Sequence, residues 1–153
     1  MSISPDSQFV QTIGSATFTL VSDLFFPASS SIIVTYPATI SATNIASTSV
    51  TQCSLNGTLV SGASYQVSSN IITFSGVFSS NFKGTVVIKI PSFTNPSTIQ
   101  PSTYQLAIND QNNYGVMTSS FAFTASSKPL ISNNISASSY QVLDSGVTYT
   151  LSL

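Results

Sequence analysis

The chain has 153 residues, 42% of them hydrophobic and only 5% charged, and its formal net charge is −1. It contains no His, Glu, Arg or Trp. A core for one domain is available, but a His-dependent nucleophile, a His-ligated zinc site and the basic surface that nucleic acid requires are all excluded. We therefore expect a protein that is not an enzyme and that has no cofactor, no metal and no nucleic-acid partner.

Because only 5% of the residues are charged and about a third are Ser or Thr, hydroxyl and amide groups must supply most of the hydration of the surface. A neutral surface of this kind is typical of a glycosylated extracellular chain or of a packed array of copies. Two triplets, Asn56-Gly57-Thr58 and Asn134-Ile135-Ser136, match the N-glycosylation pattern. They predict possible glycans on Asn56 and Asn134, although a Ser-rich chain also produces such triplets by chance.

Short β-branched and aromatic runs recur between clusters of Ser, Asn, Gly and Pro, and no stretch has a sustained helical period. In chain order, the expected strands are residues 17–21, 31–36, 50–53, 58–61, 70–74, 84–90, 103–108 and 114–124. Asn56-Gly57 suits a tight hairpin turn. Alternation within the strands places one set of side chains in a common core: Phe18, Leu20, Ile32, Val34, Ile88, Leu106 and Ile108. This pattern predicts an all-β, antiparallel, two-sheet sandwich.

The two ends of the chain resemble each other. Ile3-Ser4, Gly14 and the alternating residues 17–20 recur as Ile135-Ser136, Gly146 and residues 148–151, with one residue of slippage. Chance similarity in a Ser/Thr-rich background is the alternative. We expect a sandwich in residues 1–125, a linker in residues 126–134, and the first strands of a following repeat, or a donated strand, in residues 135–153. The inter-module strand would present one apolar face made of Tyr149, Leu151 and Leu153.

Residues 84–108 contain a strand, an Asn-Pro-Ser-Thr-x-x-Pro turn at residues 95–101, and a second strand with an aromatic residue. Residues 25–37 read as an apolar-Pro step followed by Ile-x-Val-x-aromatic-Pro. Over residues 15–125 the chain resembles the tandem immunoglobulin-like repeats of large extracellular surface or adhesin-type proteins of ciliates. The resemblance implies an immunoglobulin-like fold, an extracellular or cell-surface location, and no catalytic residues.

Candidate residues can also be named for more specific functions. An oxygen-rich calcium loop would use Asp110 with Asn109, Asn112 and Asn113, although a polar hairpin turn explains the same residues. Lys89 is the candidate for an isopeptide crosslink, but it is out of phase with its inward neighbours. Exposed aromatic residues able to bind sugar are Tyr36, Tyr65, Tyr114 and Tyr140. Cys53, the single cysteine, is interpreted as a small buried hydrophobe or, alternatively, as an intermolecular bridge or a reactive thiol.

No apolar run is long enough to span a bilayer, and residues 1–5 lack the features of a signal peptide. We expect no membrane insertion in this chain, and any export signal would lie outside it. The leading hypothesis is a non-enzymatic structural or adhesive module of an extracellular surface protein or filament. Its partners would be neighbouring copies of the module, joined end to end by tandem repetition or strand addition, with glycans as a further possibility. The alternative is a carbohydrate-binding β-sandwich module.

Overall fold

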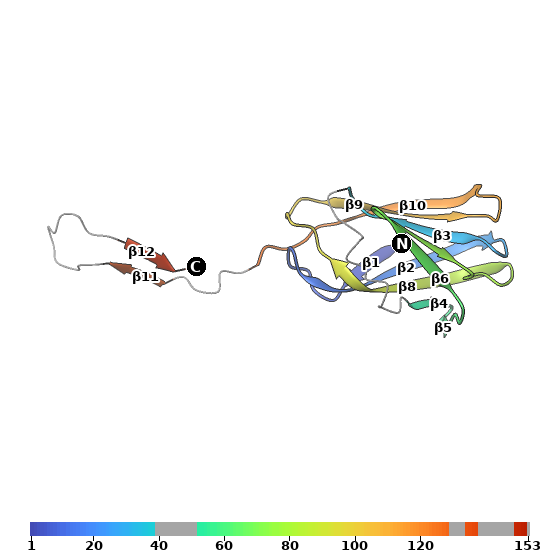
Figure 1. Cartoon of the computed structure of the whole chain (residues 1–153), viewed down its shortest axis with the longest axis horizontal. Coiled ribbons are helices and arrows are strands. Elements are labelled where there is room, and N and C mark those ends of the chain that lie inside the picture. The colour runs from blue at the N-terminus through green and yellow to red at the C-terminus, as the bar shows by residue number, and fades with distance from the viewer. Residues whose placement is uncertain (39–51, 129–133, 138–148, 153) are drawn as a thin grey trace.

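The computed structural model describes residues 1–38, 52–128, 134–137 and 149–152. All regular elements in these residues are β-strands, and every strand pairing is antiparallel. Two five-stranded sheets pack face to face, and a separate two-stranded sheet follows them in the chain (Figure 1). The expected all-β, immunoglobulin-like sandwich is confirmed.

The first large sheet, sheet 1, has a long central pair of strands. Its spatial order is β1 (Ser2–Pro5), β2 (Ile13–Phe26), β8 (Phe82–Thr94), β4 (Gln52–Leu55) and β5 (Thr58–Leu59). β2 and β8 pair from Ile13 opposite Thr94 to Phe26 opposite Phe82, with two irregularities of register. β2 continues past the expected end at residue 21, because the apolar residues 24–26 carry on the strand after the second irregularity.

The second large sheet, sheet 2, has the spatial order β10 (Gly115–Phe123), β9 (Ser102–Asn109), β3 (Ser31–Thr35), β7 (Ile71–Ser75) and β6 (Ser64–Ser68). The chain therefore alternates between the sheets. It passes from β2 to β3, returns to sheet 1 for β4 and β5, enters sheet 2 for β6 and β7, returns for β8, and ends in sheet 2 with β9 and β10. The sequence did not predict β6. Its half-buried Tyr65 and Val67 alternate with exposed polar residues, so this short edge strand carries little hydrophobic signal.

Two tight turns follow from residues that accept unusual backbone angles. Asn56 and Gly57, with φ of 47° and 81°, form the predicted two-residue hairpin between β4 and β5. The Asn56 side chain lies against Gly84, where an added Cβ would collide with its Oδ1 atom. Gly84 also has φ of 135°, so the close approach of β8 to this turn depends on the absence of a side chain.

The core lies between the two large sheets. All seven side chains expected there are buried: Phe18, Leu20, Ile32, Val34, Ile88, Leu106 and Ile108. Phe18 makes edge-to-face contacts with four rings, at centroid distances of 5.9 to 6.3 Å; the four are Tyr36, Phe93, Tyr104 and Phe121. Since Phe18 and Phe93 belong to sheet 1 and the other partners belong to sheet 2 or follow β3, this aromatic cluster joins the two layers.

The two tyrosines of the cluster are buried with their hydroxyl groups. Among the described residues, neither the Tyr36 nor the Tyr104 hydroxyl has a hydrogen-bond partner. Burial raises the pKa of both phenols above the ordinary value, and the proximity of Tyr104 adds to the effect at Tyr36. The two rings therefore stabilise the core by packing, whereas burial of their hydroxyl groups without a hydrogen bond lowers the free energy of unfolding.

Replacing Phe18 with Ala removes the ring that contacts both sheets, and we expect it to lower the free energy of unfolding by about 3–5 kcal/mol. Tyr104→Phe keeps the ring and removes an unpaired hydroxyl, so it should change stability by about 1 kcal/mol or less, or increase it. Urea denaturation of both variants measures the difference. A loss of more than about 2 kcal/mol in Tyr104→Phe would mean that this hydroxyl has a stabilising partner.

Stability should also fall at alkaline pH. A phenol whose pKa is raised on folding keeps its proton above about pH 10, where the unfolded chain has released it. The free energy of unfolding therefore decreases as the pH rises, by up to about 1.4 kcal/mol per pH unit for each retained proton. We expect a lower urea midpoint at about pH 11 than at about pH 8, with a smaller difference in Tyr36→Phe/Tyr104→Phe. Equal pH dependence in that variant would contradict the assignment.

Candidate functional site

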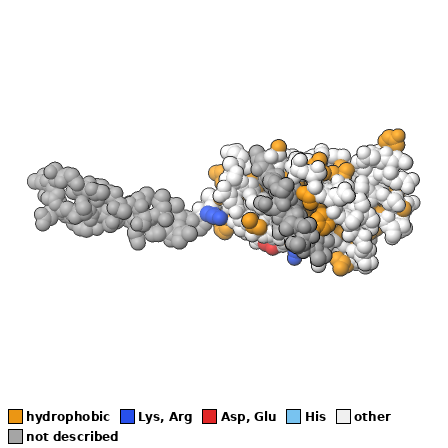
Figure 2. All heavy atoms as spheres, in the orientation of Figure 1, with side chains coloured by type: hydrophobic (Ala, Val, Ile, Leu, Met, Phe, Trp, Pro, Cys, Tyr) orange, Lys and Arg blue, Asp and Glu red, His pale blue; other side chains and the backbone are white. Residues whose placement is uncertain are grey.

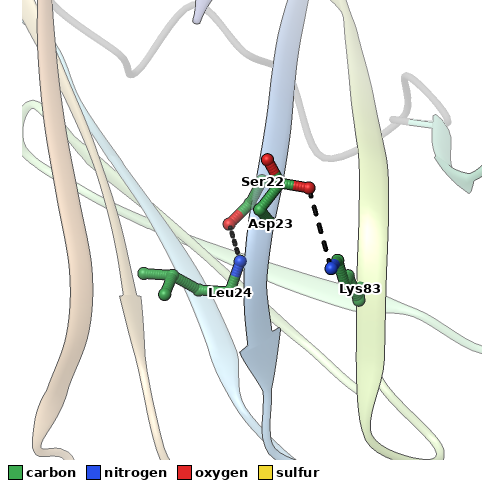
Figure 3. A network of polar contacts seen from close by, with 4 residues as sticks. All are labelled: Ser22, Asp23, Leu24 and Lys83. Atoms are coloured by element: carbon green, nitrogen blue, oxygen red, sulfur yellow. Dashed lines mark hydrogen bonds and ion pairs between the residues drawn. The ribbon is translucent and has the colours of Figure 1, made fainter.

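Within the described ranges, the charged side chains do not form a reactive group. Asp23 and Lys83 face each other with 3.7 Å between Oδ1 and Nζ, and both side chains are exposed. The neighbouring Ser22 hydroxyl accepts a hydrogen bond from the Leu24 amide, as Figure 3 shows. The Lys83 ammonium also lies 5.8 Å from the centre of the Phe25 ring. An exposed pair of this kind stabilises a strand slightly and offers no acid–base chemistry.

The remaining described carboxylates hold turns. The Asp6 carboxylate accepts hydrogen bonds from the Ser15 hydroxyl and backbone amide, and these bonds lower the Asp6 pKa. Asp110 accepts the amides of Asn112 and Tyr114 at 2.9 and 2.8 Å. Replacing Asp6 or Asp110 would remove hydrogen bonds within the chain, so both carboxylates have a structural role.

The oxygen-rich loop after β9 is a polar hairpin turn. Besides the bonds to Asp110, the Asn109 side chain donates to Asn113 at 2.9 Å. No group of three or more His, Cys, Asp or Glu residues lies together within the described ranges. The structure thus uses these oxygens for the turn, and Asp144 lies outside the described residues.

The structure also describes most of the other residues for which the sequence suggested a specific function. Cys53 is buried, as expected for a small hydrophobe, and burial raises the pKa of its thiol to about 11. Lys89 is exposed on sheet 1. Among the tyrosines suggested for sugar binding, Tyr36 is buried, Tyr65 is half-buried and Tyr114 is 72% exposed; Tyr140 lies outside the described residues. These positions do not form an aromatic platform among the described residues.

An open depression of about 270 Å³ lies beside the β4–β5 hairpin. Its lining combines apolar residues such as Leu55 and Val77 with the hydroxyls of Thr58, Ser61 and Ser79. The lining residues include no titratable group, so the depression has no means of acid–base catalysis. No helix in the described part of the chain is long and apolar enough to cross a membrane.

The two sequons lie in different settings. Asn56 is exposed, and its Oδ1 accepts the Thr85 amide at 2.8 Å. The side chain thereby ties the β4–β5 turn to β8. Asn134 is the first residue of β11 (Asn134–Ala137) and pairs with Ser152. Glycosylation at both positions stays a prediction.

One end of the sandwich is organised around a single buried side chain, Asn95. Its Nδ2 donates to the carbonyl oxygens of Ser7 and Phe9 at 2.6 and 2.7 Å, and its backbone amide donates to Thr12 at 3.0 Å. Asn95 is 3% exposed, so it fixes the loop between β1 and β2 from inside. The sequence marked residues 95–101 as a turn; it did not show that the amide binds a loop about 85 positions away.

The chain leaves the sandwich beside this loop. Ser126 donates to Gln8 at 2.7 Å and accepts from Val10 at 2.9 Å, in a parallel bridge centred on Phe9. We call residues 7–12, 94–96 and 126 the linker end. These hydrogen bonds anchor the last sandwich residues to the N-terminal loop before the chain continues towards β11.

The C-terminal strands form a hairpin of their own. β11 pairs with β12 (Tyr149–Ser152), and among the described strands neither joins a larger sheet (Figure 1). Ile135 lies opposite Leu151, and Ala137 lies opposite Tyr149. Leu153, the third residue of the expected apolar face, lies outside the described residues. The strand expected to join a neighbouring module therefore has one partner, β11, among the described strands.

This hairpin resembles the β1–β2 pair at the start of the sandwich, but its register differs. There, Ile3 of β1 lies opposite Phe18 of β2. The sequence repeat matches Ile3 with Ile135 and Phe18 with Tyr149, so the C-terminal pairing is shifted by two residues. The resemblance between the two ends thus extends from sequence to strand pairing.

Comparisons with known proteins give no family. No protein-family model and no curated protein matches the chain. Among solved structures, the chain is similar to the crystal structure of BslA, which is described as a bacterial hydrophobin. The two share 12% sequence identity with a TM-score of 0.49, over 80% of this chain and 93% of that one. A likeness at this level does not transfer a function.

The linker end provides a direct test of its buried amide. Asn95→Asp keeps the shape but replaces two N–H donors with a carboxylate that faces two carbonyl oxygens. We expect a loss of about 3 kcal/mol or more in the free energy of unfolding. Asn112→Asp, at an exposed position, is the matched control and should cost about 0.5 kcal/mol or less. Equal losses in urea denaturation would show that Asn95 does not hold the loop.

Proposed function

We propose that this chain is a non-enzymatic structural module of an extracellular surface protein or filament, joined end to end with similar modules. The observation that carries the proposal is the C-terminal hairpin, which pairs the sequence counterparts of β1 and β2 in a register shifted by two residues and lies outside both large sheets. An isolated two-stranded hairpin is marginally stable in water. Its function is therefore to begin or complete another sandwich.

The free side of the hairpin indicates how it joins a neighbour. In the sandwich, β2 pairs with β1 on one side and with β8 on the other. β12 corresponds to β2 and has β11 on one side, whereas its other side has no partner among the described strands. We infer that a strand equivalent to β8 occupies that side, supplied by a following repeat or by another copy.

The linker end supports transmission of force along such an array. A pull on residue 126 acts on the bonds to Gln8 and Val10 and, through the same loop, on Asn95. The force would therefore be distributed over three segments that are far apart in the sequence: residue 126, residues 7–12 and residues 94–96. In an array, force applied between two modules would act on the residue where the chain leaves the sandwich. Hydrogen bonds at that residue to several segments would resist its separation from the sandwich.

The surface composition agrees with an extracellular array. Uncharged polar side chains and backbone dominate the view in Figure 2, with scattered hydrophobic and few charged groups. The two sequons would add solubility where glycans are attached. The carbohydrate-binding alternative is less favoured, because Tyr114 is the only one of its four candidate tyrosines that the structure shows as strongly exposed within the described ranges.

Module exchange tests the proposal. If residues 134–151 begin a second sandwich, they should replace residues 2–20 at the start of the first. We expect the chimeric chain to fold into the same β-sandwich, at reduced stability because Tyr149 brings a hydroxyl to the buried Phe18 position. Circular dichroism and cooperative urea unfolding provide the measurement, and Tyr149→Phe in the chimera should recover part of the loss.

The control chimera carries the same 18 residues in scrambled order and should not fold. If the ordered chimera and its Tyr149→Phe form unfold like the scrambled one, residues 134–151 are not a module start. In the intact chain, removal of residues 140–153 should leave the sandwich folded. Unfolding of the sandwich after that deletion would place the last strand in its own core and would contradict the proposal.

A further inference from the structure

Charge is distributed unequally between the two sheets. The strands of sheet 2 contain no charged residue at all. The charges of the described chain lie on sheet 1, in turns, or beyond the sandwich: Asp6, Asp23, Lys83, Lys89, Asp110 and Lys128. Sheet 2 and its two edges are therefore electrically neutral.

β10 forms the longer edge of this neutral sheet. It has nine residues, Gly115–Phe123, and pairs with β9 alone among the described strands. Exposed sheet edges normally carry Lys, Pro or an inward-pointing charge that prevents pairing with another chain. β10 contains none of these, so its free backbone N–H and C=O groups are available to a further strand.

The side chains of β10 favour such an addition. Met117 and Phe121 are partly buried against the core. Phe121 stacks on Tyr104 with 5.5 Å between the ring centres and contacts Phe18 at 5.9 Å. Phe121 extends the aromatic cluster to the sheet edge, and Met117 and Phe121 both stay partly exposed there. A strand added at β10 would complete their burial.

We propose that β10 is the interface with β10 of a second copy of this chain, paired antiparallel about a two-fold axis at Ser119. This register places Met117 of each copy opposite Phe121 of the other, and Thr118 opposite Ser120. Sulfur–aromatic contacts of this type are favourable. The irregularity of register between Gly115 and Met117 lies outside this central segment.

A second copy is favoured over an unrelated strand for two reasons. The pattern of Met117, Ser119 and Phe121 is complementary to itself under a two-fold rotation, as an isologous interface requires. No charge on β10 opposes the approach of an identical edge. The other edge strands offer shorter ladders, since β6 has five residues, β1 has four and β5 has two.

This contact is lateral and differs from the end-to-end contact proposed for the C-terminal hairpin. Sheet 2 of one copy would continue into sheet 2 of the other. Chains linked end to end by their hairpins would thereby be connected side by side through β10. The two contacts use separate strands, so each can be lost without loss of the other.

The test introduces charge at the proposed interface in the full chain. Thr118 and Ser120 are exposed on the outer face of β10, and Thr118→Lys/Ser120→Lys places Lys opposite Lys twice across the two-fold axis. We expect the dimer dissociation constant from sedimentation equilibrium to rise about tenfold or more. Because the new repulsion is electrostatic, added salt should partly reverse the change.

The matched control is Thr103→Lys/Gln105→Lys, which adds the same charges to exposed positions of the same sheet face, one strand further in. It should leave the dimer intact. Hydrogen exchange provides a second measurement, because β10 amides should become more protected as protein concentration increases. A monomeric wild-type chain, equal effects of the two variants, or concentration-independent exchange in β10 would each overturn the proposal.

Discussion

The packing of Phe18 is the interaction on which the rest of the sandwich depends. This ring comes from sheet 1, and three of its four aromatic partners come from sheet 2 or from the residue after β3. Two sheets with so few ion pairs have little other than apolar burial to hold them together. The same cluster reaches Phe121 at the sheet edge, so the core and the proposed lateral interface are physically continuous.

The near absence of charge has consequences beyond solubility. The turns are held by short polar side chains: Asp110 accepts two backbone amides in the β9–β10 turn, and Asn56 accepts one from β8 at the β4–β5 turn. Strand edges lack the lysines that usually discourage pairing between chains. A protein of this composition tolerates, and in our proposal uses, contact with its own copies.

The linker end and the C-terminal hairpin connect the fold to the proposed function. Asn95 holds the loop before β2, and the same loop holds Ser126 through backbone bonds. The chain that continues from this point forms an antiparallel hairpin from the sequence counterparts of β1 and β2, in a register shifted by two residues. In our proposal, the sandwich is the template for the module that this hairpin begins or completes.

The sequence by itself determined the fold class, the core and the exclusion of most chemistry. Period-two alternation identified Phe18, Ile88 and Leu106 as core residues, because each strand has one face against the other sheet. It missed β6, whose polar residues give a weak pattern, and it left open whether residues 135–153 begin a following repeat or form a donated strand. Only the tertiary structure decided which strands lie at the edges and that the Asn95 amide clamps a loop distant in sequence. Those features depend on which segments meet in space, and local periodicity contains no information about such long-range pairing.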